Sequence, residues 1–164
     1  GADAIEEDFA NQLISINTPA KGRHWISIEN RELAELILAT YGDKDKRTIL
    51  EVAFTNPSVI LDILEATRIP KSSGYRLINQ LVENGLLTEQ GYAESSDGKK
   101  VNKYTALFEK VNIEIDTTGL IFTANTPLPS LPTVEVLLKE NILNESQIIR
   151  VLLRKKLSPT NNTS

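Results

Sequence analysis

The sequence of 164 residues contains no cysteine and no methionine, and it has one histidine, His24. The lack of cysteine excludes disulfides and thiolate metal ligands. One imidazole cannot build a histidine-rich metal site, and a histidine beside Trp25 is more often a packed surface residue than a ligand. We therefore expect neither a metal nor another cofactor.

Long apolar segments are also missing from the sequence. No run approaches the roughly 20 apolar residues that a membrane-spanning helix needs. The first residues do not contain the apolar region of a secretory signal. We expect a protein without a membrane segment, for which the cytoplasm is the default location.

Positive charge is scarce for a protein that would bind nucleic acid. The chain has 18 Lys and Arg against 22 Asp and Glu, a formal net charge of −4, and its pI is near 5.1. Phosphate binding favours clustered Lys and Arg, so the whole-chain charge argues against a general attraction to nucleic acid. Residues 68–110 differ, because they contain seven Lys and Arg side chains against five Asp and Glu side chains. This window is mildly basic.

The composition suits a single globular domain with arms. Apolar residues make up 40% of the chain, enough for a core, and the charged content of 24% is ordinary. We expect four segments, namely an N-terminal arm over 1–27, a main domain over 28–110, a hairpin, proline linker and C-terminal helices over 111–157, and a disordered tail over 158–164.

Three helices are predicted in the first half of the main domain. Apolar residues at helical spacing place them at about 30–41, up to about 54, and 59–66. Asp43 or Asp45 is placed to cap the second of them. A turn follows the third helix, because Pro70 disfavours the helical region at the residue before it.

The central segment of the chain is the next helix, predicted over 72–84. Ser72 is placed to cap its first turn. Its apolar face is formed by residues at helical spacing, Leu77, Ile78, Leu81 and Val82. The Asn84-Gly85 pair ends it, because glycine accepts the left-handed backbone that a helix terminus requires.

A polar hairpin is predicted directly after this helix. Residues 86–90 read as a strand, 91–100 as a glycine-bounded polar loop and 101–107 as the return strand. The tip of this hairpin, residues 91–103, is the predicted wing.

The rest of the chain is predicted to be a second hairpin followed by helices. Alternating apolar residues over 111–115 and the run 120–123 suggest the hairpin, and three prolines make 126–132 a linker without a regular helix. Residues 133–157 are predicted to be helical in two pieces.

The pattern over about 40–107 resembles a known family. Charged residues 43–47 precede Ile49 and Leu50, Ser72 and Ser73 open the central helix, and residues 81–86 have the form Leu-x-x-x-Gly-Leu. This is similar to the winged helix-turn-helix of prokaryotic transcriptional regulators, closest to the arsenic-repressor-like and archaeal regulator groups. The resemblance implies an α+β, mainly α fold, with a three-helix core, a β wing, an N-terminal arm and C-terminal helices.

The chain departs from that family in two ways. The turn has Arg68 where the family often has glycine or asparagine, so a bulky residue would take an awkward backbone angle. Metal-sensing relatives use Cys or His clusters, which this sequence lacks. Metal sensing is therefore not expected.

The resemblance implies sequence-specific binding to double-stranded DNA, with the 72–84 helix in the major groove and the wing on the backbone. Helix N-termini favour phosphates, Arg suits guanine and Asn suits adenine. The candidate contacts are the phosphate-binding Lys71, Ser72 and Ser73, the base-reading Tyr75, Arg76 and Asn79, and the wing lysines Lys99, Lys100 and Lys103. The competing interpretation is that they are ordinary solvated side chains, with Tyr75 packed on the turn.

A homodimer is expected, because regulators of this kind place two such helices on two half-sites. The helices predicted within 133–157 would form the two-fold contact, with a contribution from 30–41. The alternative is that both pack on their own domain. No sequence feature identifies a small-molecule effector.

Two other classes of function compete with this interpretation. A winged helix that binds protein instead of DNA would fit the acidic net charge. An enzyme is not expected, because the glycines are scattered rather than gathered in a phosphate loop, and no serine or carboxylate has a histidine within the same predicted domain.

Overall fold

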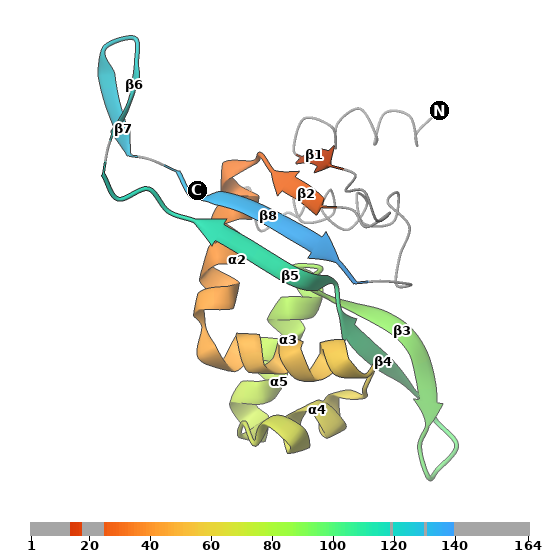
Figure 1. Cartoon of the computed structure of the whole chain (residues 1–164). Helices are drawn as coiled ribbons and strands as arrows, with labels where there is room; N and C mark the ends of the chain where they lie inside the picture. The colour runs from red at the N-terminus through yellow and green to blue at the C-terminus, as the bar shows by residue number, and fades with distance from the viewer. Residues whose placement is uncertain (1–13, 18–24, 119, 130, 140–164) are drawn as a thin grey trace.

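The computed structural model describes residues 14–17, 25–118, 120–129 and 131–139 (Figure 1). The elements in chain order are β1 (Ile14–Asn17), β2 (Trp25–Ile28), α2 (Arg31–Gly42), α3 (Lys44–Thr55), α4 (Ile60–Thr67), α5 (Lys71–Glu83), β3 (Leu87–Glu94), β4 (Lys100–Ala106), β5 (Phe108–Glu114), β6 (Leu120–Thr123), β7 (Thr126–Pro129) and β8 (Thr133–Leu138).

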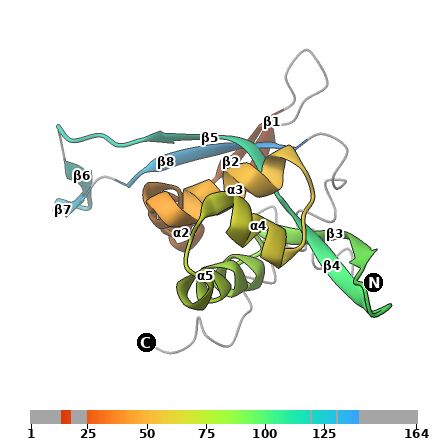
Figure 2. The same ribbon diagram turned by 90° about the horizontal axis from the view of Figure 1, so that it is seen from below.

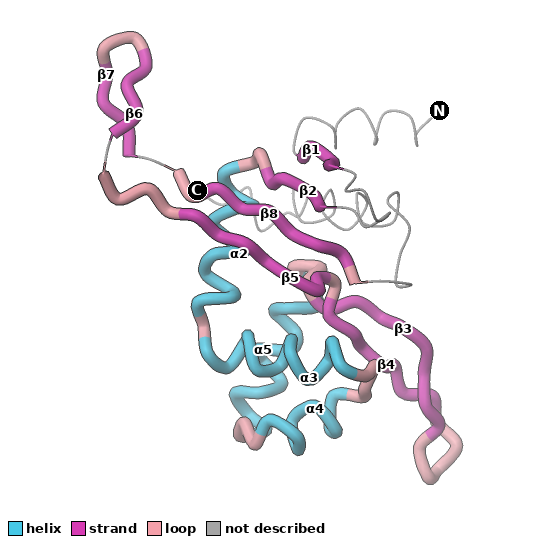
Figure 3. Tube along the Cα trace, in the orientation of Figure 1, coloured by secondary structure: helices cyan, strands magenta, loops and turns pink. Residues whose placement is uncertain are grey.

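The described chain is an α+β structure with four helices and small antiparallel sheets (Figure 3). Helices and strands take similar shares of it, so the expectation of a mainly helical protein was wrong for this part of the chain. Part of this difference is β8, at 133–138, where the sequence predicted a helix. Within the described part, no helix is both long enough and apolar enough to span a membrane.

The first two helices, α2 and α3, begin at side-chain caps. The Asn30 side chain accepts a hydrogen bond from the Leu33 N–H at 3.0 Å at the start of α2. Of the two candidate caps for α3, Asp43 takes the role, because its Oδ1 accepts from the Lys46 N–H at 2.9 Å. Each bond satisfies a backbone donor that has no partner within its helix.

The four helices lie on one side of a four-stranded antiparallel sheet of order β1-β2-β8-β5 (Figure 2). Ile26 pairs with Val136 and Ile28 with Val134, and all four side chains are buried. α2 contacts both β2 and β8. Full burial of one such side chain is worth about 1.5–3 kcal/mol, so this layer is a large part of the core.

Two predictions for the second half of the chain were wrong. Residues 133–138 form strand β8, not a helix, and β5 pairs with β8 rather than with β6. The physical reason is that this segment pairs with both β2 and β5, which buries Val134 and Val136 on one face and turns Glu135 to the other. β8 therefore lies between β2 and β5.

The proline-rich segment is also different from the predicted linker. Residues 126–129 form β7, which pairs with β6 in a separate two-stranded sheet. Ala124 and Asn125 make the turn, with φ of 48° and 66°, the left-handed values of a tight hairpin turn. The predicted helix beyond residue 139, the tail over 158–164 and the arm before residue 14 lie outside the described residues.

Candidate nucleic-acid interface

Helices α4 and α5 are joined by a three-residue turn, 68–70. Arg68 has φ 60° and ψ 21°, the left-handed conformation, and its N–H donates to the Leu64 carbonyl at 2.9 Å. Glycine or asparagine adopts this backbone more easily, so Arg68 holds a strained position. Ile69 is buried between the helices with 8% of its surface exposed, which anchors the turn.

The two helices approach one another closely at Gly74. A Cβ atom placed on Gly74 would lie 2.3 Å from Leu64 Cδ2, a distance that packed atoms do not reach. The crossing depends on glycine inside α5 even though glycine weakens a helix. Leu77, Ile78 and Leu81 complete the buried face of α5.

The start of α5 corrects one expectation. The helix begins at Lys71, and Ser72 does not cap it, because Pro70 occupies the cap position and no side chain makes a capping bond. Gly74 N–H donates to the Pro70 carbonyl at 2.8 Å. The Ser73 hydroxyl donates to the same carbonyl at 3.2 Å. Ser72 is exposed one position inside the helix.

The end of α5 agrees with the predicted Asn84-Gly85 stop. Gly85 has φ 81°, its N–H donates to the Val82 carbonyl, and the Leu86 N–H donates to the Leu81 carbonyl, both at 3.0 Å. These two bonds form a Schellman motif, which satisfies carbonyls at the helix terminus. The chain then enters β3 at Leu87.

One face of α5 is free of the described chain. Ser72, Tyr75, Arg76 and Asn79 are exposed, and their spacing of three and four residues puts them on one side of the helix. Tyr75 keeps 39% of its surface exposed, so it does not pack fully on the turn. Lys71 is exposed at the helix start, and Ser73 is half-buried.

The hairpin β3–β4 follows α5 and has a shorter loop than predicted. Its strands extend to Glu94 and from Lys100, so the turn spans only residues 95–99. A bulge interrupts the pairing between Glu89 and Tyr92. The base of the hairpin is bound to the body, because Ser58 and Tyr104 exchange backbone hydrogen bonds of 3.0 and 2.8 Å.

The three candidate lysines of the wing do not point the same way. Lys100 lies over the Tyr92 ring, with Nζ 4.6 Å from its centre. Lys103 is three residues along the same strand and therefore belongs to the opposite face of the hairpin. Lys99 Nζ is 4.0 Å from the Asp97 carboxylate at the tip. Lys99 and Lys100 therefore have different partners near the hairpin tip, and Lys103 belongs to the other face.

Asp97 organises the turn at the hairpin tip. Its carboxylate accepts hydrogen bonds from the Ser95 hydroxyl and, at 3.3 Å, from the Lys99 N–H. These bonds, the Ser95 bond first, hold the pKa of Asp97 below its ordinary value. The tip therefore keeps its negative charge next to Lys99.

The charge of this surface is balanced rather than basic. Residues 60–84 contain Arg68, Lys71 and Arg76 against Asp62, Glu65 and Glu83, and residues 87–106 contain three lysines against three acids. Arg68 was not among the predicted contacts. Because it is exposed between α4 and α5, it adds a guanidinium to the same end of α5 as Lys71.

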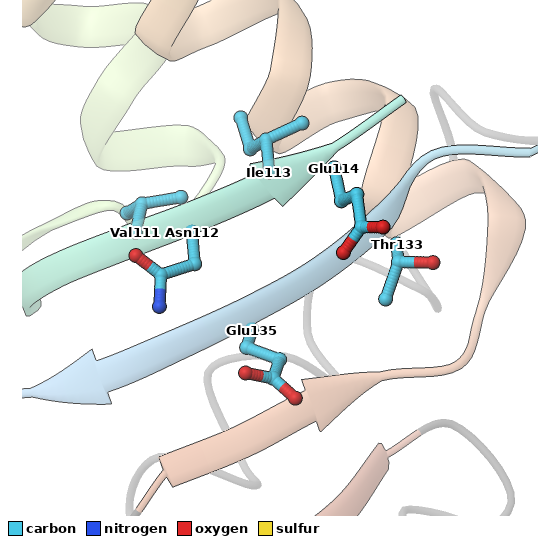
Figure 4. Close-up of a pocket in the computed structure, with 6 residues that line it drawn as sticks. All are labelled: Val111, Asn112, Ile113, Glu114, Thr133 and Glu135. Carbon is cyan, nitrogen blue, oxygen red and sulfur yellow. The ribbon is translucent and has the colours of Figure 1, made fainter. Parts of the chain in front are cut away.

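A separate hollow of about 600 Å³ lies on the sheet, away from α5. It is lined by Val111, Asn112, Ile113, Glu114, Thr133 and Glu135. The polar side chains of this set point to one side of β5 and β8, and Val111 and Ile113 point to the other (Figure 4). No group of three or more potential metal ligands occurs among the residues that the structure describes.

Comparison with known proteins produced no relative. No family model, no curated protein and no solved structure matches the chain.

Proposed function

We propose that this chain is a sequence-specific DNA-binding transcriptional regulator of the winged helix-turn-helix type. In this proposal α5 enters the major groove, and the β3–β4 hairpin is the wing beside it. The observation that carries the proposal is the exposed polar face of α5, opposite a face that is packed tightly on α4. The order of α3, the Ser58 bridge, α4, α5 and the hairpin is compatible with this architecture.

The residues of the exposed face suit base reading. Arg76 can donate two hydrogen bonds to guanine, and Asn79 can pair with adenine in the same way. Each such contact discriminates by about 1–3 kcal/mol. Lys71 and Ser72 would hold phosphates at the start of α5, where the N-terminal dipole also favours an anion.

The balanced charge has a consequence for affinity. Non-specific binding comes mainly from phosphate contacts, and each contact contributes about −0.9 to the slope of log K against log salt. Because α4, α5 and the β3–β4 hairpin have as many acidic as basic side chains, one copy of the chain makes few such contacts. Tight binding would then require a dimer that sets two α5 helices about 34 Å apart.

Selection from a pool of random-sequence duplexes tests the proposal. We expect one sequence to be enriched, and Arg76→Ala to weaken binding to it roughly 5- to 150-fold, the equivalent of about 1–3 kcal/mol. The melting temperature should stay nearly unchanged, because Arg76 is exposed. Affinities at about 50 mM and about 200 mM salt separate base contacts from phosphate contacts.

Arg31→Ala is the matched control, because it removes one exposed positive charge at the start of α2. Its affinity for the enriched duplex should remain close to that of the unaltered chain. If no sequence is enriched, or if Arg76→Ala binds as well as Arg31→Ala, α5 does not read DNA.

A protein-binding module is the second candidate function. Leu61 on α4 has 52% of its surface exposed, and the neighbouring Asp62 and Glu65 are exposed as well. An exposed apolar residue suits a protein partner, and the two acidic side chains beside it would repel a phosphate backbone. Asp62→Asn with Glu65→Gln distinguishes the two, because it should raise DNA affinity only if α4 lies near the DNA.

A further inference from the structure

Among the residues that the structure describes, the β6–β7 hairpin lies apart from the other helices and strands. Figures 1 and 2 show it beyond the ends of β5 and β8, away from the helices. Its two strands pair with one another and belong to neither of the other sheets. A two-stranded hairpin is at best marginally stable in water, because it has no third strand or helix to pack on.

The composition of this hairpin is unusual for an isolated surface element. β6 reads Leu-Ile-Phe-Thr and β7 reads Thr-Pro-Leu-Pro. Close to its base, Ile115 and Leu131 keep 55% and 41% of their surfaces exposed. Apolar residues in this arrangement indicate a surface that another molecule covers.

The prolines make the two edges of the hairpin different. In a hairpin closed by a two-residue turn, the pair that flanks the turn exchanges hydrogen bonds and the next pair does not. Thr123 and Thr126 flank the turn, so Phe122–Pro127 and Leu120–Pro129 are non-hydrogen-bonded pairs. The backbone groups of these residues therefore face outward.

Only the β6 edge can form a regular ladder of backbone hydrogen bonds with another strand. Proline has no N–H, so the outer edge of β7 has no donor at Pro127 or Pro129. On the outer edge of β6, the N–H and carbonyl groups of Leu120 and Phe122 pair with no other strand in the described part of the chain.

We propose that β6 pairs with β6 of a second copy of this chain, antiparallel and across a two-fold axis. Such a contact is self-complementary, as a two-fold interface must be. Leu120 of each copy would pair with Phe122 of the other, which uses all the outward donors, and Ile121 would lie on the axis. The resulting four-stranded sheet ends in a proline-bearing strand on both sides, so growth stops at a dimer.

This inference goes beyond the DNA-binding proposal and does not depend on it. The dimer contact predicted from the sequence was a helical one over 133–157, whereas β8 occupies 133–138 in the body of the molecule. The hairpin supplies a contact from a different part of the chain. A dimer without DNA binding would leave this inference standing.

The first test is the mass of the full chain in solution, measured by sedimentation equilibrium. We expect two chains of 18.2 kDa each in the micromolar range, and a monomer for Phe122→Pro. This change removes one outward N–H of β6 and no hydrogen bond within the hairpin, because Phe122 and Pro127 form a non-hydrogen-bonded pair. A monomeric unaltered chain, or a Phe122→Pro chain that dimerises equally well, overturns the proposal.

Phe122→Val is the matched control, because it keeps the N–H while it shortens the side chain. It should remain dimeric at concentrations where Phe122→Pro is monomeric. If both variants dissociate to the same extent, the backbone pairing of β6 is not the contact.

The second test uses the absence of cysteine from the chain. Two residues facing one another across the axis in a non-hydrogen-bonded pair have Cα atoms about 4.5 Å apart, within the range of a disulfide. Mild oxidation of Ile121→Cys should therefore link two chains. Thr126→Cys, on β7, should stay unlinked under the same conditions, and equal linking of both variants contradicts the register.

The third test replaces the two prolines on the outer edge of β7. Pro127→Val with Pro129→Val restores two outward donors to β7, so dimers should join into larger assemblies. Light scattering of this variant should give masses above that of the dimer. A mass unchanged from the dimer would show that the prolines do not limit pairing.

Discussion

The two hairpins of the described chain are held in different ways. β3–β4 begins and ends in the core, where Leu87, Thr105 and Ala106 are buried, and the Thr105 hydroxyl donates to the Ala53 carbonyl of α3 at 3.1 Å. β6–β7 pairs with itself and extends away from the body. The first hairpin is part of the fold, whereas the second is an appendage.

The difference in anchoring matches a difference in composition. The tip of β3–β4 carries Asp97, Lys99 and Lys100, all exposed, because burial at its base already stabilises the hairpin. β6–β7 has apolar strands instead. An anchored hairpin can present polar groups to a ligand, while an unanchored one gains most from association with another chain.

The largest expected effect is loss of stability when the anchor itself is removed. Leu107 directly follows β4, is fully buried, and shares backbone hydrogen bonds with Leu86 and Lys139. Leu107→Ala should lower the free energy of unfolding by about 2–5 kcal/mol, because it leaves a cavity. Denaturant titration measures this change.

Val101→Ala within the β3–β4 hairpin is the control, since Val101 is 39% exposed. Its effect should lie within about 0.5 kcal/mol. Similar losses for both variants would contradict the claim that burial at the base anchors β3–β4.

The second effect concerns the crossing of α4 and α5, on which β3–β4 depends. Gly74→Ala should destabilise the chain by about 1–3 kcal/mol, because its methyl group collides with Leu64. Gly42→Ala, at the end of α2, has no atom within 4 Å of the new Cβ and should be neutral or slightly stabilising. Thermal melts that shift equally would remove the claim of close packing.

The third effect is a gain in stability from the turn. Arg68→Gly should raise the free energy of unfolding by about 1 kcal/mol, because glycine adopts the left-handed backbone without strain. If the guanidinium contacts a phosphate, DNA affinity should fall in the same variant. Arg68→Lys keeps both the charge and the strain, so unchanged stability and affinity are expected for it.

The smallest effect is local and depends on pH. Hydrogen bonds from Ser95 and Lys99 lower the pKa of Asp97 in the folded chain. The stabilisation that these bonds give to the hairpin tip is therefore fully present above the unfolded pKa of about 3.9. It is lost as the pH falls through the lower folded pKa. Hydrogen exchange of the Lys99 amide should speed up there, and Asp97→Asn should remove this dependence. An identical pH profile for the variant would exclude Asp97 as the cause.

The helical half of the fold was predictable from the sequence because its signals are local. The cap at Asp43 acts on the Lys46 N–H three residues away, and the stop at Gly85 acts within one turn of α5. The exposed face of α5 followed from the same spacing, including Tyr75, Arg76 and Asn79. The one local error, Ser72 as the cap, arose because Pro70 starts the helix one residue earlier.

The sheet half was not predictable in the same way. The six residues of β8 end in Val136, Leu137 and Leu138, a run that fits a helix as well as a strand. What makes it a strand is its place between β2 and β5, which lie far away in the sequence.

The sequence alone determined the positions of the four helices, the stop at Gly85 and the polar face of α5, because each of these depends on residues within one or two helical turns. The tertiary structure decided which strands pair, the close approach of Leu64 to Gly74, and the position of β6–β7 away from the other described elements. These features depend on contacts between distant segments and on which strand edges remain open, and no local pattern carries that information.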